Sequence, residues 1–373
     1  MASEPSTLPD DSPPEEAAVP DRVRPGVGVE PGRRLGRAVA YYALAATFRG
    51  LQPTTRERFT RDPARPWLDR VFYATDDGWE APLYRLPVRA GASAEPVILA
   101  HGLGVNRHSL DYAEGMSLAG ALAAAGFAVY LMEHRADRSA CPPPDARPFD
   151  FDDIASQDLP AALDRVREHS GFERVLYVGH GLGGQLLYAH HALGGDEVAA
   201  ACTLSAPVQF ERPRSMASAL RVARLLLPRG LSLPTRATAA LMAPSARSGG
   251  GLASMALPGE VARGLLLHGT EDLPGGLLAQ VLLWQELGHL SDRSGRFDYT
   301  AALRGLKAPL LVVASPSDPL CRPSQADIPG LEHERVLLPE GWGHLDALLS
   351  AEAKDNVYPR VVGFLDQHRA RCW

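Results

Sequence analysis

The chain has 373 residues, of which 38 are basic and 44 acidic, and a formal net charge of −6 at neutral pH. This balance argues against a nucleic-acid-binding protein, which concentrates basic residues on one face. The four cysteines lie far apart and form no C-x-x-C pair, which argues against a disulfide framework or a zinc ribbon and favours a reducing, cytoplasmic compartment.

The N-terminal segment, residues 1–35, is rich in proline and acidic residues and poor in large apolar ones. It cannot bury enough apolar surface to offset the entropy of ordering, so we expect a disordered tail and no signal peptide. The apolar stretch 38–48 is too short to span a bilayer, which takes about 20 residues. We favour a helix packed on the domain. The alternative is an interfacial helix that contacts a membrane surface.

From residue 70 onward, short apolar runs alternate with helical stretches, as in a mostly parallel sheet flanked by helices. The predicted strands are Val71–Ala74, Ala81–Tyr84, Pro96–Ala100, Phe127–Met132, Arg174–Val178, Val198–Leu204, Pro309–Ala314 and Arg335–Leu338. The predicted helices are Leu110–Ala125, 155–169, Leu182–Leu193 and Glu352–His368. The sequence therefore predicts an α/β fold.

Residues 207–305 interrupt this alternation, because they contain helical stretches and no run typical of a buried strand. Helices are expected over Met216–Leu227, Thr235–Met242 and Leu277–Leu287, with a flexible break at Gly249-Gly250-Gly251. We interpret this block as a helical cap inserted into one α/β core, whose two parts are residues 36–206 and 306–373.

A glycine-rich turn joins the strand ending at Val178 to the helix that follows it, with the sequence Gly179-His180-Gly181-Leu182-Gly183-Gly184. The glycines suit a sharp turn and a helix packed closely against its strand. Other polar loops also follow predicted strands: His101-Gly102-Leu103, a loop with Asp318, and a loop with His344.

These features together resemble the α/β-hydrolase family over residues 70–370. In that family a G-x-S-x-G turn presents the nucleophile, and the acid and the base follow in that chain order. The resemblance implies that Gly181 occupies the nucleophile position, that Asp318 is the acid and that His344 is the base. The oxyanion hole would be formed by the backbone N–H groups of Leu103 and Leu182.

Two stretches more closely resemble the branch of lysosomal acid lipases and bacterial polyhydroxyalkanoate synthases. One is Asp272–Gln280 with Trp284, and the other is Gly343-His344-Leu345-Asp346. The resemblance implies hydrolysis or acyl transfer of a hydrophobic carboxylic ester. The substrate-binding surroundings would include His101, Gly102 and His180, although packing is the simpler role for His180.

Glycine at position 181 keeps the turn and removes the reacting group, so the acyl-enzyme route is closed. Three interpretations stay open. The protein is a non-catalytic binder of an acyl ligand or partner, like the N-myc downstream-regulated relatives. It is a hydrolase that uses water activated by His344 and Asp318. Or another side chain attacks; the candidates near strand ends are Cys202, Ser205 and Cys321, and this third interpretation is the weakest.

The sequence implies no metal or organic cofactor, and its expected ligand is a hydrophobic ester or acyl group. Two histidine-containing segments outside the motifs receive structural roles. His190-His191 point about 100° apart on one helix and cannot chelate one metal together. Glu133-His134-Arg135, after the strand ending at Met132, is expected to make loop contacts.

Overall fold

The structure, a computed structural model, describes residues 69–87, 94–211, 222, 224–242 and 259–373. The predicted tail over 1–35, the apolar stretch 38–48, the glycine break at 249–251 and most of the helix expected over Met216–Leu227 lie outside these residues. The division into two core parts and a cap therefore stays a prediction.

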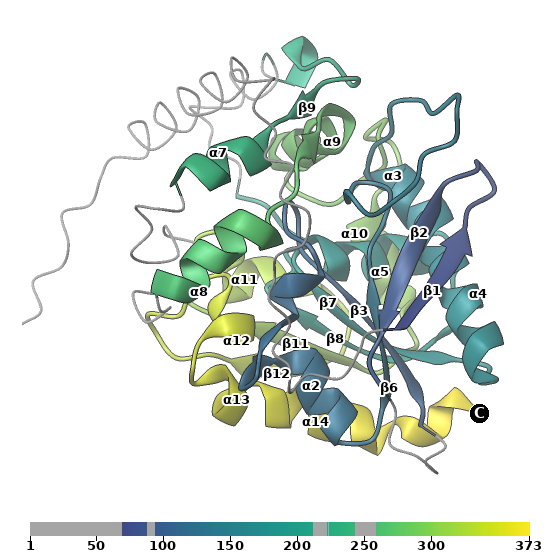
Figure 1. Cartoon of the computed structure of the whole chain (residues 1–373), viewed down its shortest axis with the longest axis vertical. Helices are drawn as coiled ribbons and strands as arrows, with labels where there is room; N and C mark the ends of the chain where they lie inside the picture. The colour runs from purple at the N-terminus through teal and green to yellow at the C-terminus, as the bar shows by residue number, and fades with distance from the viewer. Residues whose placement is uncertain (1–68, 88–93, 212–221, 223, 243–258) are drawn as a thin grey trace, which may run out of the picture. The chain divides into compact units, whose positions relative to one another are not determined.

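Eight strands of the described residues form one sheet in the order β1-β2-β6-β3-β7-β8-β11-β12 (Figure 1). β1 and β2 form an antiparallel pair at one edge, β2 is antiparallel to β6, and all pairings from β6 to β12 are parallel. The bounds are β1 Asp69–Ala74, β2 Glu80–Arg85, β3 Pro96–Ala100, β6 Ala128–Met132, β7 Val175–His180, β8 Val198–Leu204, β11 Leu310–Ala314 and β12 Glu334–Leu337. The predicted strands are confirmed to within two residues.

Helices cover both faces of the sheet, which explains why its central strands are apolar throughout. On one face, Ile98 of β3 belongs to a core cluster with side chains of α4 (Leu159–Ser170) and α5 (Leu182–Ala192). On the other face, Val97 and Leu99 belong to a cluster with α2 (Leu118–Ala124) and α14 (Tyr358–Gln367). Adjacent residues of one strand thus serve two separate cores.

The helix predicted over Leu110–Ala125 is wrong in its first half. Arg107–Ser109 form a 3₁₀ turn, and β4 (Asp111–Ala113) pairs with β5 (Met116–Ser117) before α2 begins. The Ser117 hydroxyl donates to Asp111 and accepts from the N–H of Gly120 at 2.7 Å, so it caps the helix at this point. Before this cap, Gly115 has a φ of +75°, which a helix does not contain.

Prolines alter two other predicted helices. The helix expected over 155–169 consists of α4 preceded by α3 (Phe151–Asp153) and a π-helical turn over Ile154–Asp158. Pro160 cannot donate the bond that a regular α-helix makes four residues back. The helix expected over Glu352–His368 is divided into α13 (Ala353–Asn356) and α14, whose first turn contains Pro359.

The described part of 207–305 is mainly helical. It contains β9 (Ser232–Leu233), α7 (Thr235–Met242), α8 (Gly259–Gly264), a π-helical turn (Leu265–Gly269), β10 (Leu273–Pro274), α9 (Gly275–Leu287) and α10 (Tyr299–Ala302), with a 3₁₀ turn over Leu303–Gly305. Three further short elements complete the described chain: α11 (Pro323–Ala326), α12 (Asp346–Leu349) and a 3₁₀ turn over Arg369–Cys372. None of the described helices has the length and apolar character needed to cross a bilayer.

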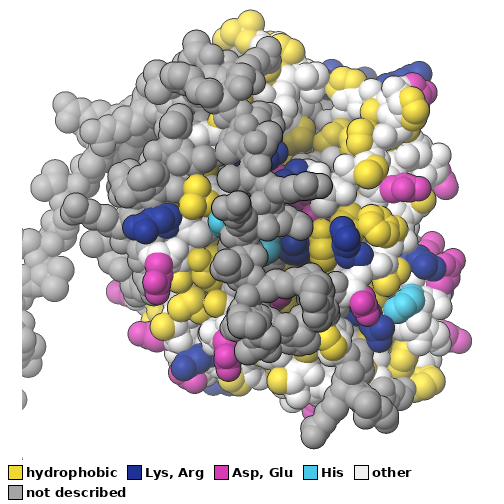
Figure 2. All heavy atoms as spheres, in the orientation of Figure 1, with side chains coloured by type: hydrophobic (Ala, Val, Ile, Leu, Met, Phe, Trp, Pro, Cys, Tyr) yellow, Lys and Arg dark blue, Asp and Glu magenta, His cyan; other side chains and the backbone are white. Residues whose placement is uncertain are grey.

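Backbone hydrogen bonds join this block to the loop after β3. The N–H of Asn106 donates to Gly269 at 3.1 Å, and the N–H of Glu271 donates to Gly104 at 2.9 Å. On the face seen in Figure 2, the described basic and acidic side chains are interspersed with apolar ones.

Candidate active site

The turn between β7 and α5 has the strained geometry of a nucleophile elbow. Gly181 has φ +51° and ψ −114°, a conformation that costs a residue with a side chain on the order of 1–3 kcal/mol. The neighbouring glycines allow the helix to approach the sheet. A Cβ on Gly183 would lie 2.2 Å from the carbonyl oxygen of Ala100, and one on Gly184 would lie 2.4 Å from the Cβ of Ala206.

His344 and Asp318 form a hydrogen-bonded pair at the carboxyl ends of β12 and β11. The distance from His344 Nδ1 to Asp318 Oδ2 is 2.9 Å. The other carboxylate oxygen accepts from the N–H groups of Leu320 and Cys321 at 2.8 and 3.1 Å. Burial raises the pKa of Asp318, but the hydrogen bond to His344 and these other contacts outweigh it, so the pKa lies below its ordinary value. Asp318 is therefore an ionised acceptor that orients His344.

The other ring nitrogen of His344 faces the elbow. An ideal Cβ on Gly181 would lie 3.3 Å from His344 Nε2 and 3.6 Å from the Cα of Gly102. A serine hydroxyl on that Cβ would be within hydrogen-bonding reach of the imidazole. The elbow, the base and the acid thus have the mutual arrangement of a triad without its nucleophilic atom.

His180 lies behind His344 rather than in an open site. Its Nε2–H donates to the carbonyl oxygen of His344 at 3.0 Å, and the two ring centroids are 4.6 Å apart. Burial and the neighbouring His344 lower the pKa of His180 to about 3, which keeps it neutral. Its ring also explains Gly102, because a Cβ there would lie 2.9 Å from His180 Nδ1. The contacts of His180 are those of a residue that positions the loop of His344.

Leu103 and Leu182 line one small cavity, together with Leu273 and Leu277 of the block 207–305. The cavity measures about 10 Å³, which is room for about one water molecule. The N–H of Leu182 belongs to the first turn of α5, where helix geometry supplies no intrahelical acceptor. The structure thus brings the two expected oxyanion residues together.

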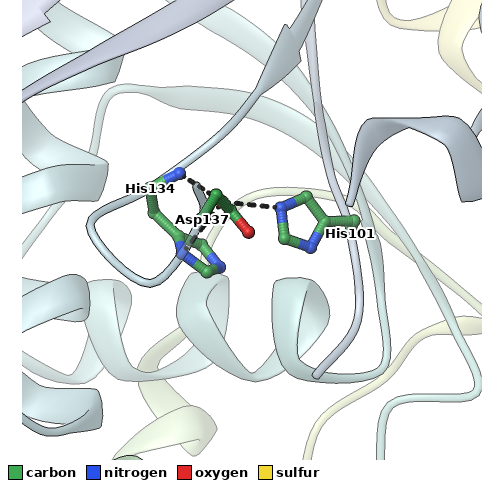
Figure 3. A group of neighbouring side chains, drawn as sticks. All are labelled: His101, His134 and Asp137. Carbon is green, nitrogen blue, oxygen red and sulfur yellow. Dashed lines mark hydrogen bonds and ion pairs between the residues drawn. The ribbon is translucent and has the colours of Figure 1, made fainter. Parts of the chain in front are cut away.

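His101 is buried, in a group that the sequence did not predict. Its ring binds Asp137, and His134 contacts the same carboxylate (Figure 3). The opposing effects of burial and of Asp137 leave the pKa of His101 raised to about 9. These three side chains could hold a metal ion. Their positions offered a signal, since His101 follows Ala100 and His134 comes two residues after Met132, and these strand ends pair in the sheet.

The other nucleophile candidates are poorly placed for the reaction. Burial raises the pKa of the Cys202 and Cys321 thiols well above the ordinary value, which disfavours the reactive thiolate. Ser205 has an unusual φ of +50°, and its buried hydroxyl lies near Asp318, on the Nδ1 side of His344. The elbow remains the position that faces the base.

A mostly parallel sheet with a strained elbow after β7, an acid after β11 and a base after β12 is the architecture of an α/β-hydrolase. The sequence model of the alpha/beta hydrolase family matches residues 97–357 of this chain. The chain belongs to that family.

Curated relatives match over a limited region. Lipase member K of Mus musculus is 32% identical over 122 residues, which cover 29% of this chain and 31% of that protein. Gastric triacylglycerol lipase of Mus musculus is 34% identical over 122 residues, with the same coverage. The chain thus spans about a third of the length of the curated relatives that it matches.

Solved structures match most of the chain at low identity. A hydrolase from Pseudomonas aeruginosa has a TM-score of 0.53 and 20% identity, covering 80% of this chain and 98% of its own. A thermophilic esterase from Thermogutta terrifontis has a TM-score of 0.53 and 19% identity, covering 81% and 99%. At this identity the likeness concerns the fold.

Proposed function

We propose that this protein hydrolyses hydrophobic carboxylic esters slowly, by direct attack of a water molecule that His344 activates. The observation that carries the proposal is the pair of His344 and Asp318, whose free imidazole nitrogen faces the elbow at Gly181. The family and the lipase relatives support an ester as the substrate. We further propose that the protein acts in the cytoplasm; for residues 38–48, peripheral membrane contact stays the alternative to a helix packed on the domain.

The reaction needs one water molecule and no covalent enzyme intermediate. Water between Gly181 and His344 Nε2 gives a proton to the imidazole as its oxygen attacks the ester carbonyl carbon. The imidazolium is stabilised by Asp318, and the N–H groups of Leu103 and Leu182 stabilise the developing oxyanion. Collapse of the tetrahedral intermediate releases the alcohol, which takes the proton back from His344.

The expected rate is low, because a positioned water replaces an activated serine. Hydrolases that lack a triad member keep roughly 10³–10⁴-fold acceleration over water. The leucines beside the oxyanion residues favour an apolar acyl group. Because the cavity there measures about 10 Å³, entry of that group requires displacement of the segment from Glu271 to Leu277.

A second candidate function is binding of an acyl ligand without turnover. It is favoured by Gly181 itself, which relieves the strain of the elbow and leaves no nucleophile. The two functions differ in whether His344 acts on water.

Hydrolysis of p-nitrophenyl esters by wild type and by His344→Ala separates these functions. We expect wild-type hydrolysis above the background rate and at least about a tenfold loss in the variant, since general-base catalysis contributes roughly 10²–10⁴-fold. His289→Ala, which removes a half-exposed histidine at a distance from the elbow, is the matched control. Equal rates for all three proteins would exclude hydrolysis by His344. A co-purified acyl ligand, identified by mass spectrometry, would then support binding.

A further inference from the structure

Two histidines and an aspartate converge below the loop that follows β3. His101 comes directly after β3, whereas His134 and Asp137 come from the loop after the neighbouring strand β6. Figure 3 shows Asp137 between the two imidazole rings. The exposed fractions of His101, His134 and Asp137 are 1%, 4% and 5%. The group therefore belongs to the interior, where each polar atom needs a partner.

The spacing of these atoms suits a small ion with short bonds. His101 Nε2 lies 3.0 Å from Asp137 Oδ2, and His134 Nδ1 lies 3.2 Å from the same oxygen. One ligand atom from each residue lies within 4.8 Å of the others. Zn²⁺ bonds of about 2.0–2.2 Å in tetrahedral geometry separate neighbouring ligand atoms by about 3.3 Å. Two of the three separations are close to that value.

The surroundings of His101 are those of a metal-binding histidine. Its Nδ1 lies 3.0 Å from the carbonyl oxygen of Gly102, which can only accept, so this nitrogen carries the proton. Metal-binding histidines commonly donate one ring N–H to a backbone carbonyl, which directs the other nitrogen to the ion. Here the other nitrogen, Nε2, faces Asp137.

The other two side chains have unmet polar atoms. Among the described residues, no hydrogen-bond partner meets His134 Nε2 or Asp137 Oδ1. His134 Nδ1 can accept from the N–H of Ala136 at 3.3 Å, and its lone pair then faces the Asp137 carboxylate. In the alternative tautomer, the lone pair of His134 Nε2 has no donor. A cation between the rings and the carboxylate would satisfy the lone pair of His134 Nδ1 in the first arrangement.

We propose that His101, His134 and Asp137 form a binding site for one divalent zinc ion. Two imidazoles and one carboxylate are a usual ligand set for this metal, and they leave a fourth position open. His134 and Asp137 line the cavity of about 10 Å³ beside Leu103 and Leu182, which has room for one water ligand. The ion would tie the oxyanion loop after β3 to the loop after β6. This site does not depend on the hydrolysis proposed above.

The test titrates the chelator-treated full chain with Zn²⁺ alone, by calorimetry, and measures bound metal by mass spectrometry after dialysis. We expect one ion per chain, and at least about a tenfold weaker affinity in His134→Gln and in Asp137→Asn. His190→Gln is the matched control, because His190 is a buried imidazole with a single carboxylate partner, Glu197, at 2.8 Å. It should bind Zn²⁺ as wild type does. Mg²⁺, which prefers oxygen ligands, should not compete.

Wild-type chain that retains no Zn²⁺ would overturn the proposal, and so would equal affinity in all variants, which indicates binding elsewhere. If the wild-type chain retains no Zn²⁺, a proton shared by His101 and Asp137 takes the place of the metal ion. If the variants fail to fold, the visible absorption spectrum of the wild-type chain with Co²⁺ tests the site instead. Intense absorption supports a four-coordinate metal site, and its absence contradicts one. Ester hydrolysis measured with and without Zn²⁺ keeps this result separate from the proposed activity.

Discussion

At the scale of single residues, we propose that Gly181 determines what chemistry the site can perform. The backbone of the elbow has the conformation that a nucleophile requires, and His344 Nε2 lies 3.3 Å from the position of a Cβ. In the proposed site, glycine therefore supplies no reacting atom, while the surroundings that a nucleophile needs are in place. A site of this kind can be completed by one side chain.

Gly181→Ser should convert the site into one that forms an acyl-enzyme. We expect p-nitrophenyl ester hydrolysis to rise at least about tenfold, with a pre-steady-state burst, because the new hydroxyl lies within reach of His344. The variant should also lose about 1–3 kcal/mol of stability, since its φ of +51° is strained for serine. Stopped-flow kinetics and urea denaturation measure the two effects.

Gly181→Ala is the control for this variant, because it adds the same Cβ and strain without a hydroxyl. It should lose similar stability and gain no burst. If the serine and alanine variants give the same kinetics, His344 does not activate the new hydroxyl. Position 181, His344 and Asp318 then do not act as a triad.

At the scale of elements, the contact between α5 and the sheet depends on glycines with no space for a side chain. Gly184, in the first turn of α5, lies so close to Ala206 that an added Cβ would be 2.4 Å from the alanine Cβ. In contrast, Gly363 of α14 has no atom within 4 Å of such a Cβ. The same substitution should therefore have opposite effects in these two helices.

Gly184→Ala should destabilise the protein by about 1–3 kcal/mol, the usual cost of overpacking a core. Gly363→Ala should stabilise it by roughly 0.5–1 kcal/mol, because alanine is the better helix former. Urea denaturation of both variants checks the pair. Equal and small effects would mean that α5 can move away from β8 at little cost.

At the scale of the whole molecule, Arg135 connects segments that are distant in the sequence. Its Nε donates to Asp158 of the π-helical turn at 2.5 Å, and its Nη atoms donate to Asp77, between β1 and β2, at 2.7 and 2.9 Å. The Arg135 side chain is 1% exposed and that of Asp158 is fully buried. Removing the guanidinium leaves a buried carboxylate without its cation.

Arg135→Ala should cost about 3–5 kcal/mol of unfolding free energy, as measured for broken buried ion pairs. The control is Arg322→Ala, whose pair with Glu211 is exposed, with side chains 56% and 65% accessible. That variant should lose no more than about 1 kcal/mol. A loss of similar size in both proteins, by urea denaturation, would contradict the structural role assigned to Arg135.

Local signals in the sequence predicted most of the sheet and the elements of the elbow. Apolar runs locate the strands because buried parallel strands need apolar residues on both faces. The hairpin over residues 111–117 was not predicted, because its turn depends on Gly115, whose φ of +75° ends a helix, and on the cap that starts α2 at Ser117. The group of His101, His134 and Asp137 was missed because it depends on which strands are neighbours.

The sequence by itself determined the class of fold and the chain order of Gly181, Asp318 and His344, which we propose as nucleophile position, acid and base. These properties reside in periodicity and in short motifs, which consecutive residues specify. Only the tertiary structure decided that His344 Nε2 faces the elbow, that His180 holds the loop of His344, and that His101 meets Asp137. Those contacts depend on strand order and register, which bring residues from separate loops to one end of the sheet within hydrogen-bonding distance.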